Sequence, residues 1–198
     1  MKAAPNIESL QAIFSEHQLV VAESAARLLP TLSNCMELTR RCLAAGGKII
    51  ACGNGGSAAD AQHFIAELVG RYDKPRAPLA GIVLGTDAAT MTAVSNDFGF
   101  EYVFSRQVDT LARSGDVLIA LSTSGNSRNV INAAVTARAR GCSVIVMTGR
   151  SGGELLQHAD IAIQVPSDTV ARIQEIHELC LHALAQALDT KAAGSSDL

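Results

Sequence analysis

The sequence lacks any excess of positive charge. Its 198 residues carry a formal net charge of −3, with an isoelectric point near 5.9. Composition therefore gives no reason to expect binding to nucleic acid or to an anionic membrane surface. The sequence also lacks an apolar run close to the roughly 18 residues that a membrane-spanning helix requires. We expect neither a nucleic-acid partner nor a membrane partner.

Cysteine pairs of the CxxC type are also absent, and the five cysteines are an odd number. The first residues, MKAAPNIESLQ, contain no apolar stretch followed by a cleavage site, so they do not resemble a secretory signal. Both observations favour small buried thiols in a reducing compartment over a disulfide framework. We expect a cytoplasmic protein.

Apolar residues are abundant: 48% of the residues are hydrophobic, 18% are charged and the mean hydropathy is +0.22. This is the composition of a globular protein, and the length is that of one domain. The apolar excess must lie in a core or in an interface between subunits. We predict a single domain over residues 1–198.

Residues 7–45 carry apolar residues at helical spacing, and Pro30 lies between two such stretches. The pattern predicts two helices, the second of them ended by Gly46 and Gly47. A hydrophobic helical pair appended to an α/β core suits an interface between subunits. The end of the sequence, residues 190–198, is small and polar, and we expect it to fray.

Beyond residue 47, short apolar runs alternate with helical segments. The runs predict strands at 48–53, 79–85, 116–122, 143–149 and 159–165. The main helical segments are 57–72, 127–141 and 170–189. This alternation indicates an α/β fold, a three-layer α-β-α sandwich around a parallel sheet of about five strands. Ligands of such sheets bind outside the carboxyl ends of the strands, here the loops that follow Cys52, Leu84, Leu121 and Met147.

The loop 53–60, GNGGSAAD, follows the first strand and opens a helix. Its glycines allow a ligand close to the backbone, and the new helix offers free N–H groups to an anion. The loop matches neither the dinucleotide pattern GxGxxG nor the P-loop with its GK[ST]. By itself it is equally compatible with a tight structural turn and with a phosphate site.

The segment 122–127, STSGNS, is more specific. Ser122, Thr123, Ser124 and Ser127 place four hydroxyls around one glycine at a predicted helix N-terminus. One or two hydroxyls suffice for a helix cap and a turn. Four of them favour a site that binds a phosphate monoester through uncharged hydrogen-bond donors. An acidic protein can also have such a site, because the donors act locally.

Two helical segments carry polar residues at helical spacing. His63 and Glu67 share a helix face and suit either a metal pair or an acid–base pair, although the spacing alone favours a solvated surface pair. Gln174, Glu178 and His182 line one face of the last helix, opposite its apolar stripe. Such a face is ordinarily solvated, unless another helix or subunit covers it.

Asn96 and Asp97, in the segment SNDFGF, are predicted to lie in a turn after a short helix. Asparagine and aspartate before a glycine are ordinary turn residues. Their side chains also suit the hydroxyls of a polyol, and the sequence leaves both interpretations open.

Four segments, taken together and in order, resemble a known family: the strand followed by GNGGSAADAQHFIAEL, then NDFGF, STSGNS and the helix RIQEIHELCLH. They are similar to the sugar isomerase (SIS) family and, within it, to the bacterial phosphoheptose isomerases. The resemblance extends from the first helices to about residue 189. It implies an SIS-type fold and the conversion of sedoheptulose 7-phosphate to D-glycero-D-manno-heptose 7-phosphate, an aldose–ketose isomerisation through an enediol.

The resemblance also implies roles at matching positions. Glu67 is implied as the catalytic base and His182 as the acid. The implied ligands of one zinc ion per subunit are His63, Glu67, Gln174 and His182. The implied substrate contacts are Asn54, Gly55, Gly56, Glu67, Asn96, Asp97, Ser122, Thr123, Ser124, Ser127 and Gln174. No nucleotide cofactor is implied.

A cytoplasmic homotetramer is a further implication, as is a product that supplies heptose for the lipopolysaccharide core or another surface glycan. The chemistry agrees with the residues. One group must take a carbon-bound proton and another must protonate or polarise the carbonyl oxygen, and a carboxylate with a raised pKa and an imidazole suit these tasks. A phosphate held away from the reacting carbons would orient the sugar chain.

Other interpretations stay open. A close SIS relative is a non-enzymatic tetramer that binds the replication initiator protein, with a small residue in place of the base. The presence of Glu67 and His182 favours an enzyme, while GNSRN at 125–129 has some likeness to that relative. An isomerase of a pentose or hexose phosphate is also open. A sugar phosphate sensor is not favoured, because the sequence has no basic DNA-binding domain.

Overall fold

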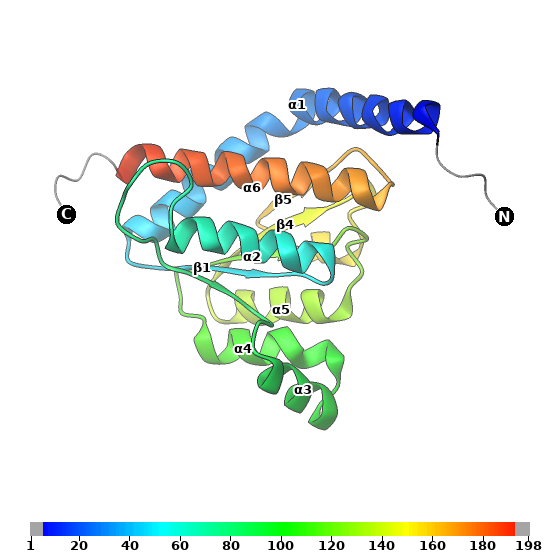
Figure 1. Ribbon diagram of the computed structural model, residues 1–198. Helices are drawn as coiled ribbons and strands as arrows, with labels where there is room; N and C mark the ends of the chain where they lie inside the picture. Colours follow the sequence, from blue (N-terminus) through cyan, green and yellow to red (C-terminus); the bar gives the residue numbers. More distant parts are fainter. Residues whose placement is uncertain (1–5, 193–198) are drawn as a thin grey trace.

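The computed structural model describes residues 6–192 and shows one parallel five-stranded sheet between two layers of helices (Figure 1). The strands are β1 (Ile49–Cys52), β2 (Gly81–Val83), β3 (Val117–Leu121), β4 (Ser143–Thr148) and β5 (Ile161–Gln164). The helices are α1 (Ile7–Ala44), α2 (Gly56–Val69), α3 (Ala88–Asp97), α4 (Val103–Leu111), α5 (Arg128–Ala139) and α6 (Val170–Ala192), with short 3-10 helices η1 (Phe100–Tyr102) and η2 (Glu154–His158). The predicted three-layer α/β fold is confirmed.

The strands are apolar throughout because helices cover both faces of the sheet. Ile49 and Ala51 face a core built with α1, α2 and α6. Ile50 and Cys52 face a second core built with α4 and α5. Alternate residues of a strand point to opposite faces, so a sheet buried on both faces needs continuous apolar runs and not an alternating pattern.

The order of the strands, β2-β1-β3-β4-β5, places the ligand crevice. The chain leaves β1 toward β2 on one side and later returns to build β3 on the other side of β1. The helices that follow these two strands, α2 and α5, lie on opposite faces. At such a switch point the carboxyl ends of neighbouring strands diverge into a crevice. The loops after Cys52 and Leu121 therefore meet at one place.

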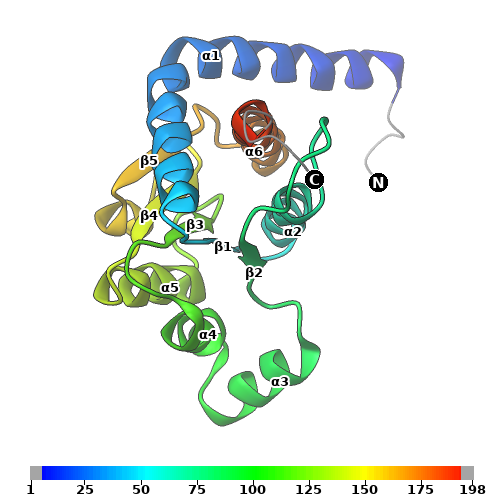
Figure 2. The same cartoon turned by 90° about the vertical axis from the view of Figure 1, so that its left-hand side faces the viewer.

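The prediction of two separate N-terminal helices is wrong, because α1 runs without interruption through Pro30. A proline inside a helix removes one backbone hydrogen bond and bends the helix, and Figure 2 shows that α1 changes direction along its length. Leu28 and Leu32, on either side of the proline, are both buried in the same core. Their packing keeps the helix continuous where the local sequence favours a break.

At the other end of the chain, α6 continues to Ala192. This is three residues into the segment 190–198 that we expected to fray, and 193–198 lie outside the described residues. All five cysteines are free and buried, as predicted. Within residues 6–192, no helix combines the length and the hydropathy needed to cross a membrane.

The segment between α2 and β2 is held by a buried ion pair. Arg76 Nε lies 2.5 Å from Asp189 Oδ1, and both side chains are almost fully buried. Arg76 also donates to the backbone carbonyls of Glu67 (2.6 Å) and Leu68 (2.8 Å). Asp189 accepts from the backbone N–H groups of Asp73 (2.7 Å) and Lys74 (3.1 Å). The guanidinium thus satisfies carbonyls at the end of α2 that have no partner within the helix.

His177, in α6, gives a first prediction. It is fully buried, and burial lowers its pKa to about 4, although the carbonyl of Thr148 opposes the shift. The unfolded chain, with an ordinary histidine pKa near 6.5, takes up the proton first as the pH falls. This contribution to stability is therefore complete above about pH 6.5 and is lost as the pH falls toward 4, by about 2 kcal/mol between pH 7.5 and pH 5.

We expect His177→Gln to reduce the loss of unfolding free energy between pH 7.5 and pH 5 by about 2 kcal/mol, measured by urea denaturation at both pH values. His158→Gln is the control, because His158 is only partly buried. An acid sensitivity of His177→Gln equal to that of the wild type would contradict the prediction.

Candidate functional site

Two parallel helices on the same face of the sheet, α2 and α6, lie side by side in both views (Figures 1 and 2). They bring His63 and Glu67 of α2 against Glu178 and His182 of α6. Glu67 Oε1 lies 3.4 Å from His63 Nε2 and 3.5 Å from His182 Nε2. Glu178 Oε1 lies 2.5 Å from His63 Nδ1 and 3.3 Å from His182 Nε2. The polar face of the last helix is thus covered by α2 and is not simply solvated.

The carboxylates of this cluster are partly removed from water. The Glu67 side chain is 12% exposed, and one buried oxygen each of Asp60, Glu67 and Glu178 has no hydrogen-bond partner. Burial raises the pKa of Glu67, although the imidazoles of His182 and His63 oppose the shift. Burial raises the pKa of Asp60 to about 6. The neighbouring carboxylate of Glu178 adds to this shift, and His63 opposes it. Unsatisfied buried oxygens are costly, so the cluster is suited to a cation or to donors of a ligand.

His63, Glu67 and His182 also form a group whose nitrogen and oxygen atoms all lie within 4.8 Å of one another. Bonds of about 2.0–2.2 Å to a tetrahedral zinc ion require donor atoms about 3.3–3.6 Å apart. The two contacts of Glu67, at 3.4 and 3.5 Å, meet this requirement. The donor set, two imidazoles and a carboxylate, is also typical of zinc.

Gln174, the fourth predicted ligand, lies at the other end of the helix face. A Cβ added to Gly56 would clash with the side-chain amide of Gln174, so the amide lies against the first turn of α2. Gly56 has no side chain to displace it. This places Gln174 beside the glycine loop, two turns of α6 before His182, and its part in metal binding stays a prediction.

Three residues of this region have no role that could be predicted from the sequence. Glu178 stood in the polar stripe of α6, but nothing in the sequence showed that α2 covers it. Asp60 precedes His63 by three residues on α2, which is a helical spacing. The ring of Tyr72 lies 5.8 Å from that of His182, and no spacing along the chain indicates this contact.

The two phosphate loops meet at the switch point, as the strand order requires. Asn54 and Asn129 exchange two side-chain hydrogen bonds of 2.9 Å, one in each direction, which tie the glycine loop to the start of α5. Ser122 Oγ donates to Ser127 Oγ over 3.0 Å. Neither α2 nor α5, both fully described, has a side-chain cap at its N-terminus. Their first N–H groups are available to an anion.

Two cavities adjoin these loops. One of about 340 Å³ is lined by Asn54, Phe100, Glu101, Ser127, Arg128 and Asn129. The other, of about 170 Å³, includes Thr123 and Ser124 and adds Arg150 from the loop after β4. A larger cavity, of about 710 Å³, lies between α3 and α4 and contains none of the clustered side chains. The chemistry therefore assigns the site to the smaller cavities and the α2–α6 cluster.

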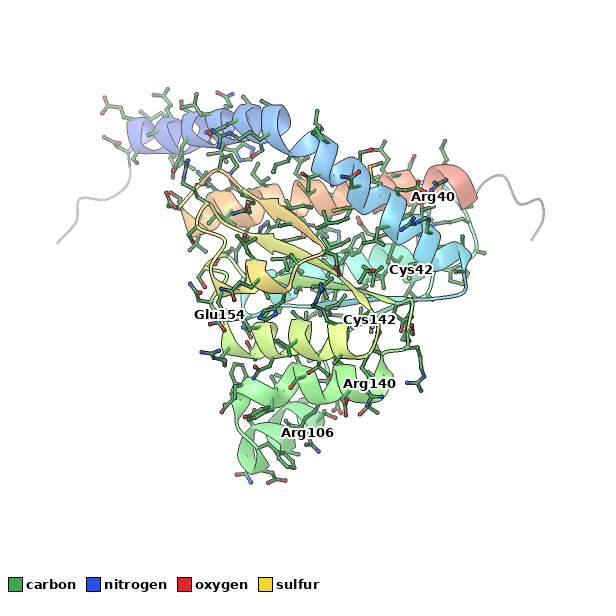
Figure 3. All side chains as sticks on the ribbon, turned by 180° about the vertical axis from the view of Figure 1, so that it is seen from behind. Arg40, Cys42, Arg106, Arg140, Cys142 and Glu154 are labelled. Atoms are coloured by element: carbon green, nitrogen blue, oxygen red, sulfur yellow. The ribbon has the colours of Figure 1, made fainter. Side chains whose placement is uncertain are left out.

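Asn96 and Asp97 do not join the site within one chain. They lie in the last turn of α3 and not in a loop, because the helix continues to Asp97, is capped by Phe98 and is followed by Gly99, whose φ of +106° turns the chain away. Both side chains are exposed, and the Asn96 amide donates to Asp97 over 2.8 Å. Figures 1 and 2 place α3 across the sheet from α2 and α6, and Figure 3 shows the neighbouring Arg106 at the end of the molecule opposite α1.

Comparisons with known proteins agree with this fold. The family model of the SIS domain matches residues 14–149. The chain therefore belongs to the SIS domain family.

Within the family, the chain is similar to proteins named phosphoheptose isomerase. The chain is 49% identical over 187 residues to the phosphoheptose isomerase of Bordetella avium, covering 93% of this chain and 95% of that relative. It is 48% identical over 182 residues to that of Helicobacter hepaticus, covering 92% of each. The solved phosphoheptose isomerase of Neisseria gonorrhoeae superposes with a TM-score of 0.88 at 45% identity, over 92% of this chain and 98% of that one. That of Francisella tularensis gives a TM-score of 0.91 at 37% identity, over 94% and 100%.

Proposed function

We propose that this sugar phosphate isomerase converts sedoheptulose 7-phosphate to D-glycero-D-manno-heptose 7-phosphate through an enediol. The observation that carries the proposal is the convergence of Glu67 and His182, 115 positions apart in the chain, to 3.5 Å in a partly buried cluster. The names of the relatives support the heptose substrate. We do not propose the non-enzymatic alternative, binding of a replication initiator, because the proposed base Glu67 and the proposed acid His182 lie together in this cluster.

Glu67 acts as the base in this mechanism. An aldose–ketose conversion removes a proton from one carbon and delivers it to its neighbour, while the oxygen on the adjacent carbon changes between carbonyl and hydroxyl. Because burial raises the pKa of Glu67, its carboxylate is a stronger base than an exposed one. His182 Nε2, on the facing helix, protonates or polarises the oxygen.

The phosphate of the substrate is held at the two loops. Ser122, Thr123, Ser124 and Ser127 offer hydroxyls, and the N-termini of α2 and α5 offer backbone N–H groups. Asn54, Gly55 and Gly56 contact the sugar phosphate from the first loop, and Gln174 lies against Gly56. Binding at a distance from the reacting carbons orients them for proton transfer. In this proposal the reaction takes place in the cytoplasm, and its product supplies heptose for lipopolysaccharide or another surface glycan.

The reaction is tested by proton exchange. We expect the wild-type protein to exchange the carbon-bound proton of sedoheptulose 7-phosphate in heavy water, followed by NMR, and to act less well on pentose and hexose phosphates. Glu67→Gln and His182→Gln should lose 10²-fold or more of turnover, because each removes one proton-transfer group. Glu23→Gln, on the exposed part of α1, is the control.

Circular dichroism and phosphate-ester binding show whether the variants keep the fold and the loops. Turnover of either variant at the wild-type rate would remove the assignment of base and acid. Exchange restricted to a shorter sugar phosphate would leave an isomerase with a different substrate.

We also propose one zinc ion per subunit at His63, Glu67 and His182, with Gln174 as the fourth protein ligand. The unpartnered oxygen of Glu67 and the spacing of the three donors support His63, Glu67 and His182 as ligands, whereas Gln174 rests on the resemblance alone. Bound zinc would supply a Lewis acid that polarises the sugar carbonyl in place of a proton on His182, because a coordinating Nε2 carries none, and Glu67 would have to leave the metal to act as the base. The chain's own part is to hold the donors: α2 presents His63 and Glu67 one turn apart, and α6 presents His182 opposite them.

The metal is tested on protein purified without added metal. We expect elemental analysis to find about one zinc per chain, chelation to abolish exchange of the substrate proton and added zinc to restore it. Full activity in a metal-free sample would end the zinc proposal while leaving the acid–base proposal intact.

The exposed apolar side chains of α1 support a homotetramer. Ile7, Phe14, Leu19 and Leu29 are each more than 60% exposed, and an accumulation of large exposed apolar side chains is typical of an interface. We expect analytical ultracentrifugation to give a mass four times that of the chain. The double variant Phe14→Glu, Leu19→Glu should have a lower association state, because each substitution buries a charge in the interface. A monomeric wild-type protein would contradict the proposed tetramer.

A further inference from the structure

Glu178 has no part in the mechanism above, yet it contacts both imidazoles of the cluster. It lies on α6 one turn before His182, with its side chain 25% exposed. Its Oε1 is 2.5 Å from His63 Nδ1 and 3.3 Å from His182 Nε2. Its other oxygen is buried without a hydrogen-bond partner.

The two ring nitrogens of His63 face different carboxylates. Nε2 is 3.4 Å from Glu67 Oε1, while Nδ1 is 2.5 Å from Glu178 Oε1. A nitrogen lone pair and a carboxylate oxygen repel at 2.5 Å, so the nitrogen in this contact carries the proton. A neutral imidazole has one proton, and its other nitrogen is then a lone-pair donor. For His63 that nitrogen is Nε2, on the side of Glu67 and His182.

The ring of His63 is held only partly by packing. Its side chain is 53% exposed, and it meets the ring of His182 edge to face, with centroids 5.0 Å apart. Its ion pairs in residues 6–192 are with Glu67 and Glu178, and the carboxylate of Asp60 is near enough to interact with it electrostatically. Which nitrogen of a histidine binds a metal is set by the partner of the other nitrogen. Without Glu178, the Nδ1 side loses its shortest carboxylate contact.

We propose that Glu178 is a positioning residue: it keeps the proton of His63 on Nδ1, so that the Nε2 lone pair points toward Glu67 and His182. The inference rests on the proposed zinc site and isomerase, and it deepens them by naming the group that prepares one ligand before metal binds.

The first test reads the tautomer directly and needs neither metal nor substrate. Metal-free protein labelled with 15N-histidine is examined at pH 8.5 by long-range 1H–15N correlation, and His63→Gln assigns the signal. We expect the Nδ1–H form in the wild type and in Glu178→Gln, whose amide oxygen still accepts. Glu178→Leu should shift the ring to the Nε2–H form.

The second test measures zinc affinity by competition with a chromophoric chelator. We expect Glu178→Leu to weaken binding 10- to 100-fold, the range typical of a lost carboxylate partner of a metal-binding histidine. Glu178→Gln should recover most of that loss.

Glu175→Leu is the matched control. Glu175 lies on the same helix and makes a similar contact, Oε2 to His17 Nδ1 at 2.6 Å, outside the cluster. It should alter the His17 signal and leave zinc affinity unchanged.

The proposal is overturned if Glu178→Leu keeps the wild-type tautomer of His63, or if it binds zinc within threefold of the wild type. Circular dichroism of the metal-free variants separates these outcomes from unfolding, and Glu178→Ala, which also lacks an acceptor, repeats both measurements if the leucine variant does not fold. A wild-type protein that binds no zinc refutes the zinc proposal, and the tautomer measurement alone then decides the role of Glu178. The proton-exchange assay judges the isomerase separately.

Discussion

The buried pair of Arg76 and Asp189 joins the ends of the two helices on which the site depends. Asp189 belongs to α6, and Arg76 binds both Asp189 and the backbone carbonyl of Glu67 at the end of α2. Loss of one partner of such a pair leaves an uncompensated buried charge, typically at a cost of about 3–5 kcal/mol. The same contacts hold the segment that carries Tyr72 against His182. Glu67, the proposed base, and the helix that carries the facing imidazole of His182 are therefore both tied to this ion pair.

The cluster itself is an energetic compromise. Partly buried carboxylates on facing helices repel one another and lose hydration, and three of their oxygens have no hydrogen-bond partner. Neighbouring imidazoles offset part of this for Glu67, and a bound cation would offset more. Such a cluster persists because the surrounding α2–α6 packing, with Phe64, Ile176 and Leu184 fully buried, supplies the stability. Functional sites commonly combine local instability with support from elsewhere.

The sheet could be predicted from the sequence because its signal is local. Continuous apolar runs such as 116–122 require burial on both faces, and the glycine and serine loops mark the carboxyl ends of β1 and β3. The continuity of α1 could not be predicted, since it depends on core contacts on both sides of Pro30. The contacts of Glu178 with His63 and His182 could not be predicted either, because spacing along one helix does not reveal which helix covers it. The resemblance supplied His182, which spacing alone placed on a solvated face.

The five buried cysteines have a consequence for the way the protein meets oxidants and alkylating agents. Burial raises the pKa of Cys35 and Cys52 to about 12 and that of Cys142 and Cys180 to about 11. The thiolate is the reactive form, so at neutral pH these sulfurs are both hidden and almost wholly protonated. Each is shielded only as long as the core around it stays closed. The rate at which a thiol reagent labels each cysteine would accordingly measure how often the part of the core around that cysteine opens.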